Sequence, residues 1–81
     1  MALTDTAIRN AKRRARPFKL ADGEGMYLLI QPSGARYWRL KYRYAGKEKV
    51  LALGVYPDTT LQAARRRRTE AREMLANDVD P

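Results

Sequence analysis

The sequence predicts an α+β domain. A three-stranded antiparallel sheet carries a long C-terminal helix packed on one face, and a short N-terminal helix precedes the sheet. Three observations predict it: strict alternation over residues 36–44, turn residues that separate three strand-like runs between residues 26 and 53, and an apolar stripe at helical spacing in residues 60–76. Residues 1–81 make a single small domain, because neither sheet nor helix is stable alone at this size.

Residues 3–12 have the pattern of a short helix. Thr4 is suited to cap its N-terminus, and Leu3 and Ile8 are spaced to pack against each other around that cap. Pro17 disfavours helix in the residue before it, so the helix is expected to end within the preceding basic run.

Three strands are expected between residues 26 and 53. The first is the short apolar run 26–31, which lies between turn signals at residues 22–25 and 32–34. The second is the alternating run 36–44, and residues 47–53 return as the third.

A two-residue loop, Ala45-Gly46, sets the register of the last two strands. It places Leu40 opposite Leu51 and Trp38 opposite Leu53, which are good core pairs. Sliding the pairing by one residue would lose this core. The loop requires Ala45 to adopt a positive φ, which glycine or asparagine tolerates better.

The second helix is predicted over residues 60–76, capped by Thr59 or Thr60. Asn77 is expected as its left-handed C-terminal residue, and residues 78–81 as the start of a linker. The side chains that should cover the sheet form a stripe, Leu61, Ala64, Ala71 and Leu75.

The composition favours a polyanionic partner. Seventeen basic residues against nine acidic ones give a net charge of +8. Nucleic acid is favoured over membrane, because no helix combines a bulky apolar face with a clean basic one and no apolar run is long enough to span a bilayer. No signal-peptide pattern is present, and the absence of cysteine fits a cytoplasmic protein.

The composition also disfavours catalysis. The chain has neither histidine nor cysteine, which excludes most nucleophile–base pairs and thiolate metal sites. The carboxylates are dispersed without metal-ligand spacing. No catalytic residue, metal, cofactor or small-molecule substrate is therefore expected.

The alternating run places cations on one face of the sheet. Tyr37, Arg39, Lys41 and Arg43 share a face, with cations roughly 6–7 Å apart, close to the phosphate spacing of a nucleic-acid strand. An ordinary solvated face mixes charges, whereas here only Glu48 offsets the cations. These four side chains are the predicted DNA-reading residues, presented to the major groove.

Two further clusters are suited to phosphate contact. Lys47 and Lys49 belong to the opposite face near the hairpin tip, and the arm before the sheet carries Arg13, Arg14 and Arg16. Either cluster is also compatible with a solvated segment. The run 65–68 fans around a helix axis and is interpreted as mostly structural or solvated.

Several motifs together cover nearly the whole chain. They are Leu3-Thr4-Asp5-Thr6-Ala7-Ile8, Leu20-Ala21-Asp22-Gly23 with Gly25 and Tyr27-Leu28, Gly34 before Tyr37-Trp38-Arg39, Lys41-Tyr42-Arg43 with Gly46-Lys47, Leu53-Gly54-Val55-Tyr56-Pro57, Leu61 with Ala64-Arg65, and Asp80-Pro81. Through them the chain resembles the N-terminal, arm-type DNA-binding domain of phage and genomic-island integrases of the tyrosine recombinase family.

The resemblance implies a function in DNA integration and excision. Such a domain precedes core-binding and catalytic domains, recognises arm-type duplex DNA beside the crossover site, and places a three-stranded sheet in the major groove. The family's catalytic residues, including its tyrosine nucleophile, lie in the C-terminal domain, so the resemblance implies no catalytic tyrosine here. It also allows other integrase subunits or excision factors as partners.

Two alternatives remain at this stage. A double-stranded RNA-binding module shares the order helix, three strands, helix, and residues 65–68 match its basic second helix. A protein-interaction module would instead use an exposed apolar patch around Val50 and Tyr37.

Overall fold

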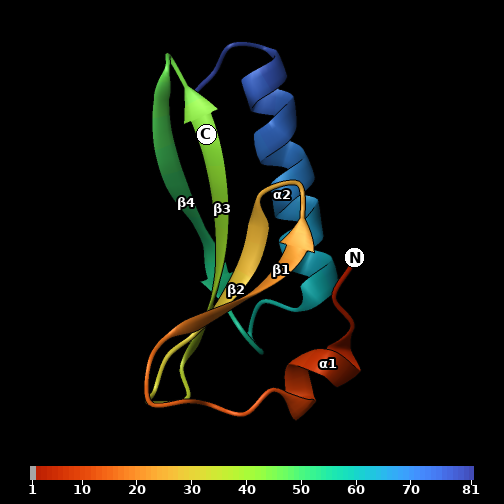
Figure 1. The fold of residues 1–81 in the computed structure, drawn as a ribbon. Helices are drawn as coiled ribbons and strands as arrows, with labels where there is room; N and C mark the ends of the chain where they lie inside the picture. Colours follow the sequence, from red (N-terminus) through yellow and green to blue (C-terminus); the bar gives the residue numbers. More distant parts are fainter. Residues whose placement is uncertain (1) are drawn as a thin grey trace.

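The structure, a computed structural model, describes residues 2–81. One antiparallel sheet has the strand order β1-β2-β3-β4, and the long helix lies across one of its faces (Figure 1). The elements along the chain are α1 (Asp5–Asn10), β1 (Phe18–Gly23), β2 (Met26–Ile30), β3 (Arg36–Tyr44), β4 (Lys47–Val55) and α2 (Leu61–Ala76). The α+β class and the position of the long helix are thus as predicted.

The sheet has four strands, and the prediction of three was wrong. The additional strand is β1, in which Phe18 pairs with Ile30 and Leu20 pairs with Leu28. Its alternating pattern is short and comes directly after Pro17. The end of the strand overlaps the turn residues 22–25, and a register shift between Ala21 and Gly23 disturbs the alternation there. Pairing with β2, more than local propensity, therefore defines this strand.

The hairpin between β3 and β4 has the predicted two-residue loop. Ala45 has a φ of 52° and Gly46 a φ of 77°, the two positive values of a type I′ turn. Leu40 lies opposite Leu51, as predicted. The twist that this turn shares with the strands outweighs the strain at Ala45.

The predicted pairing of Trp38 with Leu53 was wrong. Trp38 lies opposite Gly54, because a β-bulge shifts the register between Trp38 and Arg39. Leu53 therefore stays in the core while Val55 faces outward, opposite Tyr37. Gly54 has a φ of 135°, and a Cβ there would overlap the Thr59 hydroxyl. The bulge thus requires glycine at this position.

The core lies between the sheet and α2. Trp38 and Leu40 are buried against Ala64 and Ala71, the small residues of the predicted helical stripe. The Trp38 indole donates a 2.7 Å hydrogen bond to the Thr59 carbonyl, so its polar atom is satisfied. The remaining buried apolar side chains are Ile8, Met26, Leu28, Ile30, Leu53 and Leu61.

The helix ends partly follow the predictions. α1 spans Asp5–Asn10, shorter than the predicted 3–12, and Thr4 caps it as expected. The N-cap of α2 is Thr60, whose hydroxyl accepts a 3.1 Å bond from the Ala63 amide. The predicted left-handed Asn77 was wrong by one residue, because Asp78 has the positive φ of 59°.

The C-terminus of α2 closes as a Schellman motif. The amides of Asp78 and Val79 donate to the carbonyls of Leu75 (3.0 Å) and Met74 (2.8 Å). In this motif the residue after the C-cap has the left-handed conformation, because only then can both amides reach back to the helix. Asn77 is the C-cap, so Asp78 is the residue with the positive φ.

Candidate nucleic-acid interface

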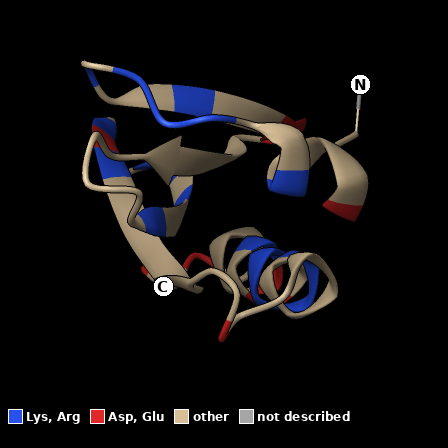
Figure 2. Cartoon of the chain, turned by 90° about the horizontal axis from the view of Figure 1, so that it is seen from below, with Lys and Arg blue, Asp and Glu red and all other residues tan. Residues whose placement is uncertain are grey.

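The uncovered face of the sheet, called here the outer face, lies opposite α2 (Figure 2). It carries the four predicted residues of β3. Tyr37 and Arg39 are half-buried, and Lys41 and Arg43 are exposed. Of the three side chains between them, Trp38 and Leu40 are buried in the core, and Tyr42 is half-buried on the side of α2. The alternation along β3 therefore separates the core from a cationic surface, as the sequence predicts.

β4 supplies the other side of this surface. Arg39 lies opposite Ala52, Lys41 opposite Val50 and Arg43 opposite Glu48. The Glu48 carboxylate bonds diagonally to Lys41, with Nζ and Oε1 2.6 Å apart. Both partners are about half exposed, so this ion pair contributes little to stability.

β1 and β2 add a part of the outer face that the sequence prediction missed. Ala21, Tyr27, Arg39 and Ala52 form one row across the four strands. Lys19 lies 4.7 Å from the centroid of the Tyr27 ring, within cation–π range. Lys19 was missed because β1 was not predicted, although its alternation with Phe18 and Leu20 was a visible signal.

Lys49 lies on the helix side of the hairpin, opposite Tyr42, as the register predicted for it and for Lys47. Its ammonium group bonds to the Asp80 carboxylate, which also accepts a 2.7 Å bond from the Tyr42 hydroxyl. The hydrogen bond to Asp80 raises the pKa of Lys49, and the bonds from Lys49 and Tyr42 lower the pKa of Asp80. Asp80, which follows α2, thus binds the hairpin through Lys49, one of the two hairpin lysines predicted to contact phosphate.

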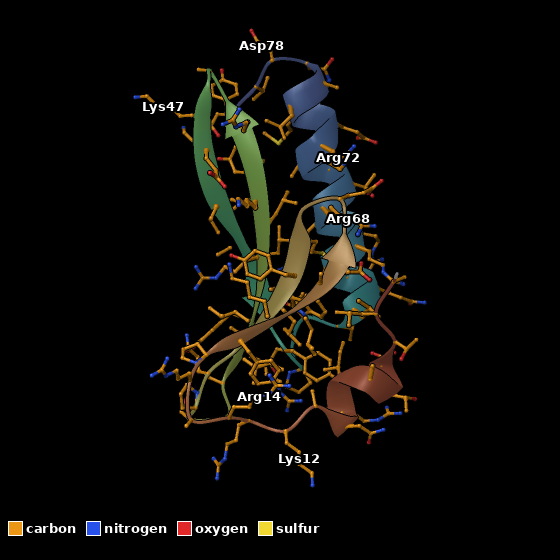
Figure 3. The ribbon with its side chains drawn as sticks, in the orientation of Figure 1. Lys12, Arg14, Lys47, Arg68, Arg72 and Asp78 are labelled. Carbon is orange, nitrogen blue, oxygen red and sulfur yellow. The ribbon has the colours of Figure 1, made fainter. Side chains whose placement is uncertain are left out.

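The basic arm lies at the other end of the molecule from Lys47, as Figure 3 shows for Arg14. Arg13 donates a 3.3 Å bond to the Ser33 carbonyl, and the Arg14 guanidinium lies 4.1 Å over the Phe18 ring. Arg16 is exposed. The structure therefore does not bring the arm and the hairpin tip together but places them at opposite ends of the sheet.

The arginines of α2 mainly serve the fold. Arg65 and Arg68 both bond to the Asp22 carboxylate, whose side chain is 1% exposed. The Leu3 amide also donates to it, at 2.8 Å. The hydrogen bond from Arg65 is the main reason that the pKa of Asp22 lies below its ordinary value. Arg67 donates a 2.5 Å hydrogen bond to the Leu53 carbonyl on the edge strand β4.

Two other kinds of site are absent from residues 2–81. Their Asp and Glu side chains form no group of three that could hold a metal ion, and the chain has no His or Cys. Neither helix of this range is long and apolar enough to cross a membrane. The outer face instead presents guanidinium, ammonium and phenol groups, which can donate hydrogen bonds to phosphates and base edges.

A basic, uncovered sheet face backed by a helix is typical of a small nucleic-acid-binding domain. Residues 3–81 match the family described as Arm DNA-binding domain, and the chain belongs to this family. The N-terminal, arm-type DNA-binding domain of integrases that the sequence indicated is thereby confirmed. The duplex RNA alternative gains no support from these comparisons.

The relatives include proteins named as integrases of a phage and a prophage. Putative protein IntB of Escherichia coli K12 is 66% identical over 56 residues, 69% of this chain and 14% of that protein. Prophage integrase IntZ of the same strain is 44% identical over 81 residues, 98% of this chain and 20% of that protein. The integrase of Enterobacteria phage P4 is 42% identical over 83 residues, 100% of this chain and 19% of that protein. The chain thus spans a fifth or less of the length of these relatives.

Proposed function

We propose that this domain recognises arm-type duplex DNA through its outer face, within a longer site-specific recombinase of the tyrosine recombinase family. The observation that carries the proposal is the row Tyr37, Arg39, Lys41 and Arg43 on one uncovered face, offset by the single carboxylate of Glu48. A two-stranded β-ribbon fits the major groove, which is about 12 Å wide. Strands β3 and β4 would enter it with their cations toward the bases.

Phosphate contacts would hold the two ends of the sheet. The arm with Arg13, Arg14 and Arg16 and the tip with Lys47 and Lys49 flank the outer face. The longest axis of the domain is 38 Å, which exceeds the roughly 12 Å width of the major groove. Charges at both ends of the sheet can therefore reach the phosphate backbone beyond the groove that the sheet enters.

The parent protein would carry out the recombination chemistry elsewhere in its sequence. Two of the three relatives are named integrases, and this chain covers a fifth or less of each of the three. We place the protein in the cytoplasm of a bacterium, where its DNA partner lies. Other integrase subunits or excision factors are further proposed partners.

Selection of bound duplexes from a random library, at two salt concentrations, tests this function. One sequence motif should emerge at both concentrations, with weaker binding at the higher one because phosphate contacts release counterions. A variant with Arg39, Lys41 and Arg43 all changed to Ala should lose the motif, whereas the exposed helix control Arg66→Ala should keep it. Stronger competition by duplex RNA than by duplex DNA, or no motif, would refute the proposal.

A further inference from the structure

Arg39 is half-buried, whereas the other cations of the outer face, Lys19, Lys41 and Arg43, are exposed. Lys41 is bound to Glu48, whereas Arg39, like Arg43, has no ion pair with any of residues 2–81. Its Nε is buried and has no hydrogen-bond partner in this range. A buried donor without a partner is costly. The Nε of Arg68 is also buried without a partner, but Arg68 bonds to Asp22 through another nitrogen, whereas the Arg39 guanidinium makes no side-chain hydrogen bond within residues 2–81.

The position of Arg39 is fixed by its surroundings. It lies on β3, an inner strand that is paired with β2 on one side and β4 on the other. Its guanidinium lies 5.6 Å from the centroid of the Tyr37 ring. Its neighbour on β4 is the small, exposed Ala52, and Arg39 itself is partly exposed, so a partner can approach the guanidinium from that side. Arg39 is thus a preorganised donor on a rigid element, as base reading requires.

Two exposed apolar side chains lie beside Arg39 on the outer face. Val50 and Val55 are 52% and 44% exposed. They face outward because they lie opposite Lys41 and Tyr37. They stand on either side of Ala52, the partner of Arg39. In the major groove, the thymine methyl is the apolar group that such side chains can contact.

We propose that Arg39 donates two hydrogen bonds to the O6 and N7 atoms of a guanine, and that Val50 and Val55 contact thymine methyl groups beside it. The inference rests on the proposed function and adds the base preference. Val50 is two residues from Ala52, roughly 6–7 Å along the strand. With base pairs about 3.4 Å apart, the contacted thymines lie within about two base pairs of the guanine.

The first experiment replaces this guanine by 7-deazaguanine in the duplex that the wild-type domain selects. Loss of the N7 acceptor should weaken wild-type binding but leave Arg39→Ala binding unchanged. On the natural duplex, Arg39→Ala should weaken binding about 5- to 150-fold. Reselection with Arg39→Ala should remove the guanine preference at that position alone, whereas the matched control Arg43→Ala should keep it.

The second experiment replaces the neighbouring thymines by uracil, which lacks only the methyl group. Wild-type binding should weaken, and the double variant Val50→Ala/Val55→Ala should not respond. Both base substitutions use the intact wild-type domain, so a folding defect in a variant cannot imitate the result.

The outcomes separate this inference from the function on which it rests. If Arg39→Ala weakens binding to all duplexes equally, Arg39 holds phosphate and the inference is wrong, while the DNA-binding function stands. Indifference of the wild-type domain to 7-deazaguanine or to uracil overturns it too. A wild-type selection that yields no motif would instead refute the proposed function.

Discussion

The arginines of α2 and the cations of the outer face are both dense in the sequence but differ in what they contact. Arg65 and Arg68 bond to Asp22, and Arg67 to the Leu53 carbonyl. Within residues 2–81, Arg39 and Arg43 have no ion pair. A run of charge in the sequence is therefore a poor measure of the charge that a partner can reach.

The period of each element explains the difference. Residues three apart on a helix share a face, so Arg65 and Arg68 reach the same carboxylate at the end of β1 (Figure 3 labels Arg68). Residues two apart on a strand share a face, so Arg39 and Arg43 both point away from α2. The helix turns its arginines toward the fold, while the strand turns its cations toward the uncovered outer face.

The largest expected effect comes from removing the shared partner of the helix arginines. Asp22→Ala leaves Arg65 and Arg68 without their carboxylate, and we expect it to lower the free energy of unfolding by about 3 kcal/mol. Urea titration followed by tryptophan fluorescence measures it. Asp58→Ala, an exposed carboxylate in a loop, is the control and should change stability by less than about 0.5 kcal/mol. A loss for Asp22→Ala as small as that of the control would contradict the structural role of these arginines.

A second test compares one arginine from each region. Arg43→Ala should cost roughly 1–3 kcal/mol of binding free energy on a selected duplex, because Arg43 is free to contact it. The exposed Arg66→Ala on α2 should leave binding unchanged. Titration at one fixed salt concentration gives both values. Equal losses of binding free energy for the two variants would show that the affinity depends on total positive charge and not on the outer face.

The Asp22 cluster also predicts a pH dependence of stability. Its hydrogen bonds lower the folded-state pKa of Asp22 below the ordinary value of 3.8. The resulting stabilisation is complete above that unfolded value and is lost progressively as the pH falls below it. Urea unfolding at several pH values between 5 and 2.5 measures how steeply the free energy of unfolding falls with pH. This range includes part of the loss that Asp22 causes. Asp22→Asn should have a shallower slope, and an unchanged slope would assign the dependence to other carboxylates.

The smallest expected effect concerns the hairpin tip. Lys49→Ala should lower the slope of log affinity against log salt by about one, with similar weakening on all duplexes. Asp80→Asn should strengthen binding slightly, because it releases Lys49 from its carboxylate partner. A loss confined to the selected duplex would contradict a phosphate role for Lys49.

Local sequence signals were sufficient to predict the β3–β4 hairpin and to place Tyr37, Arg39, Lys41 and Arg43 on one face of the sheet. Ala45-Gly46 and the apolar pairs around it define one register, because any slip would move the core residues to the outer face. The strand β1 was not predictable in the same way, since its short alternation competes with a strong turn signal. The sequence prediction therefore did not include Lys19 and Tyr27 in the outer face.

The sequence by itself determined the class of the fold, the alternation of β3 and the excess of positive charge. These depend on neighbours a few residues apart, whose spacing is set by the backbone. Only the tertiary structure decided which charges are satisfied and where the register shifts. Asp22 meets Arg65 across 43 residues of chain, and the bulge at Gly54 depends on Trp38 and Thr59. Contacts between distant segments form only when helix and sheet pack together, so no local pattern can specify them.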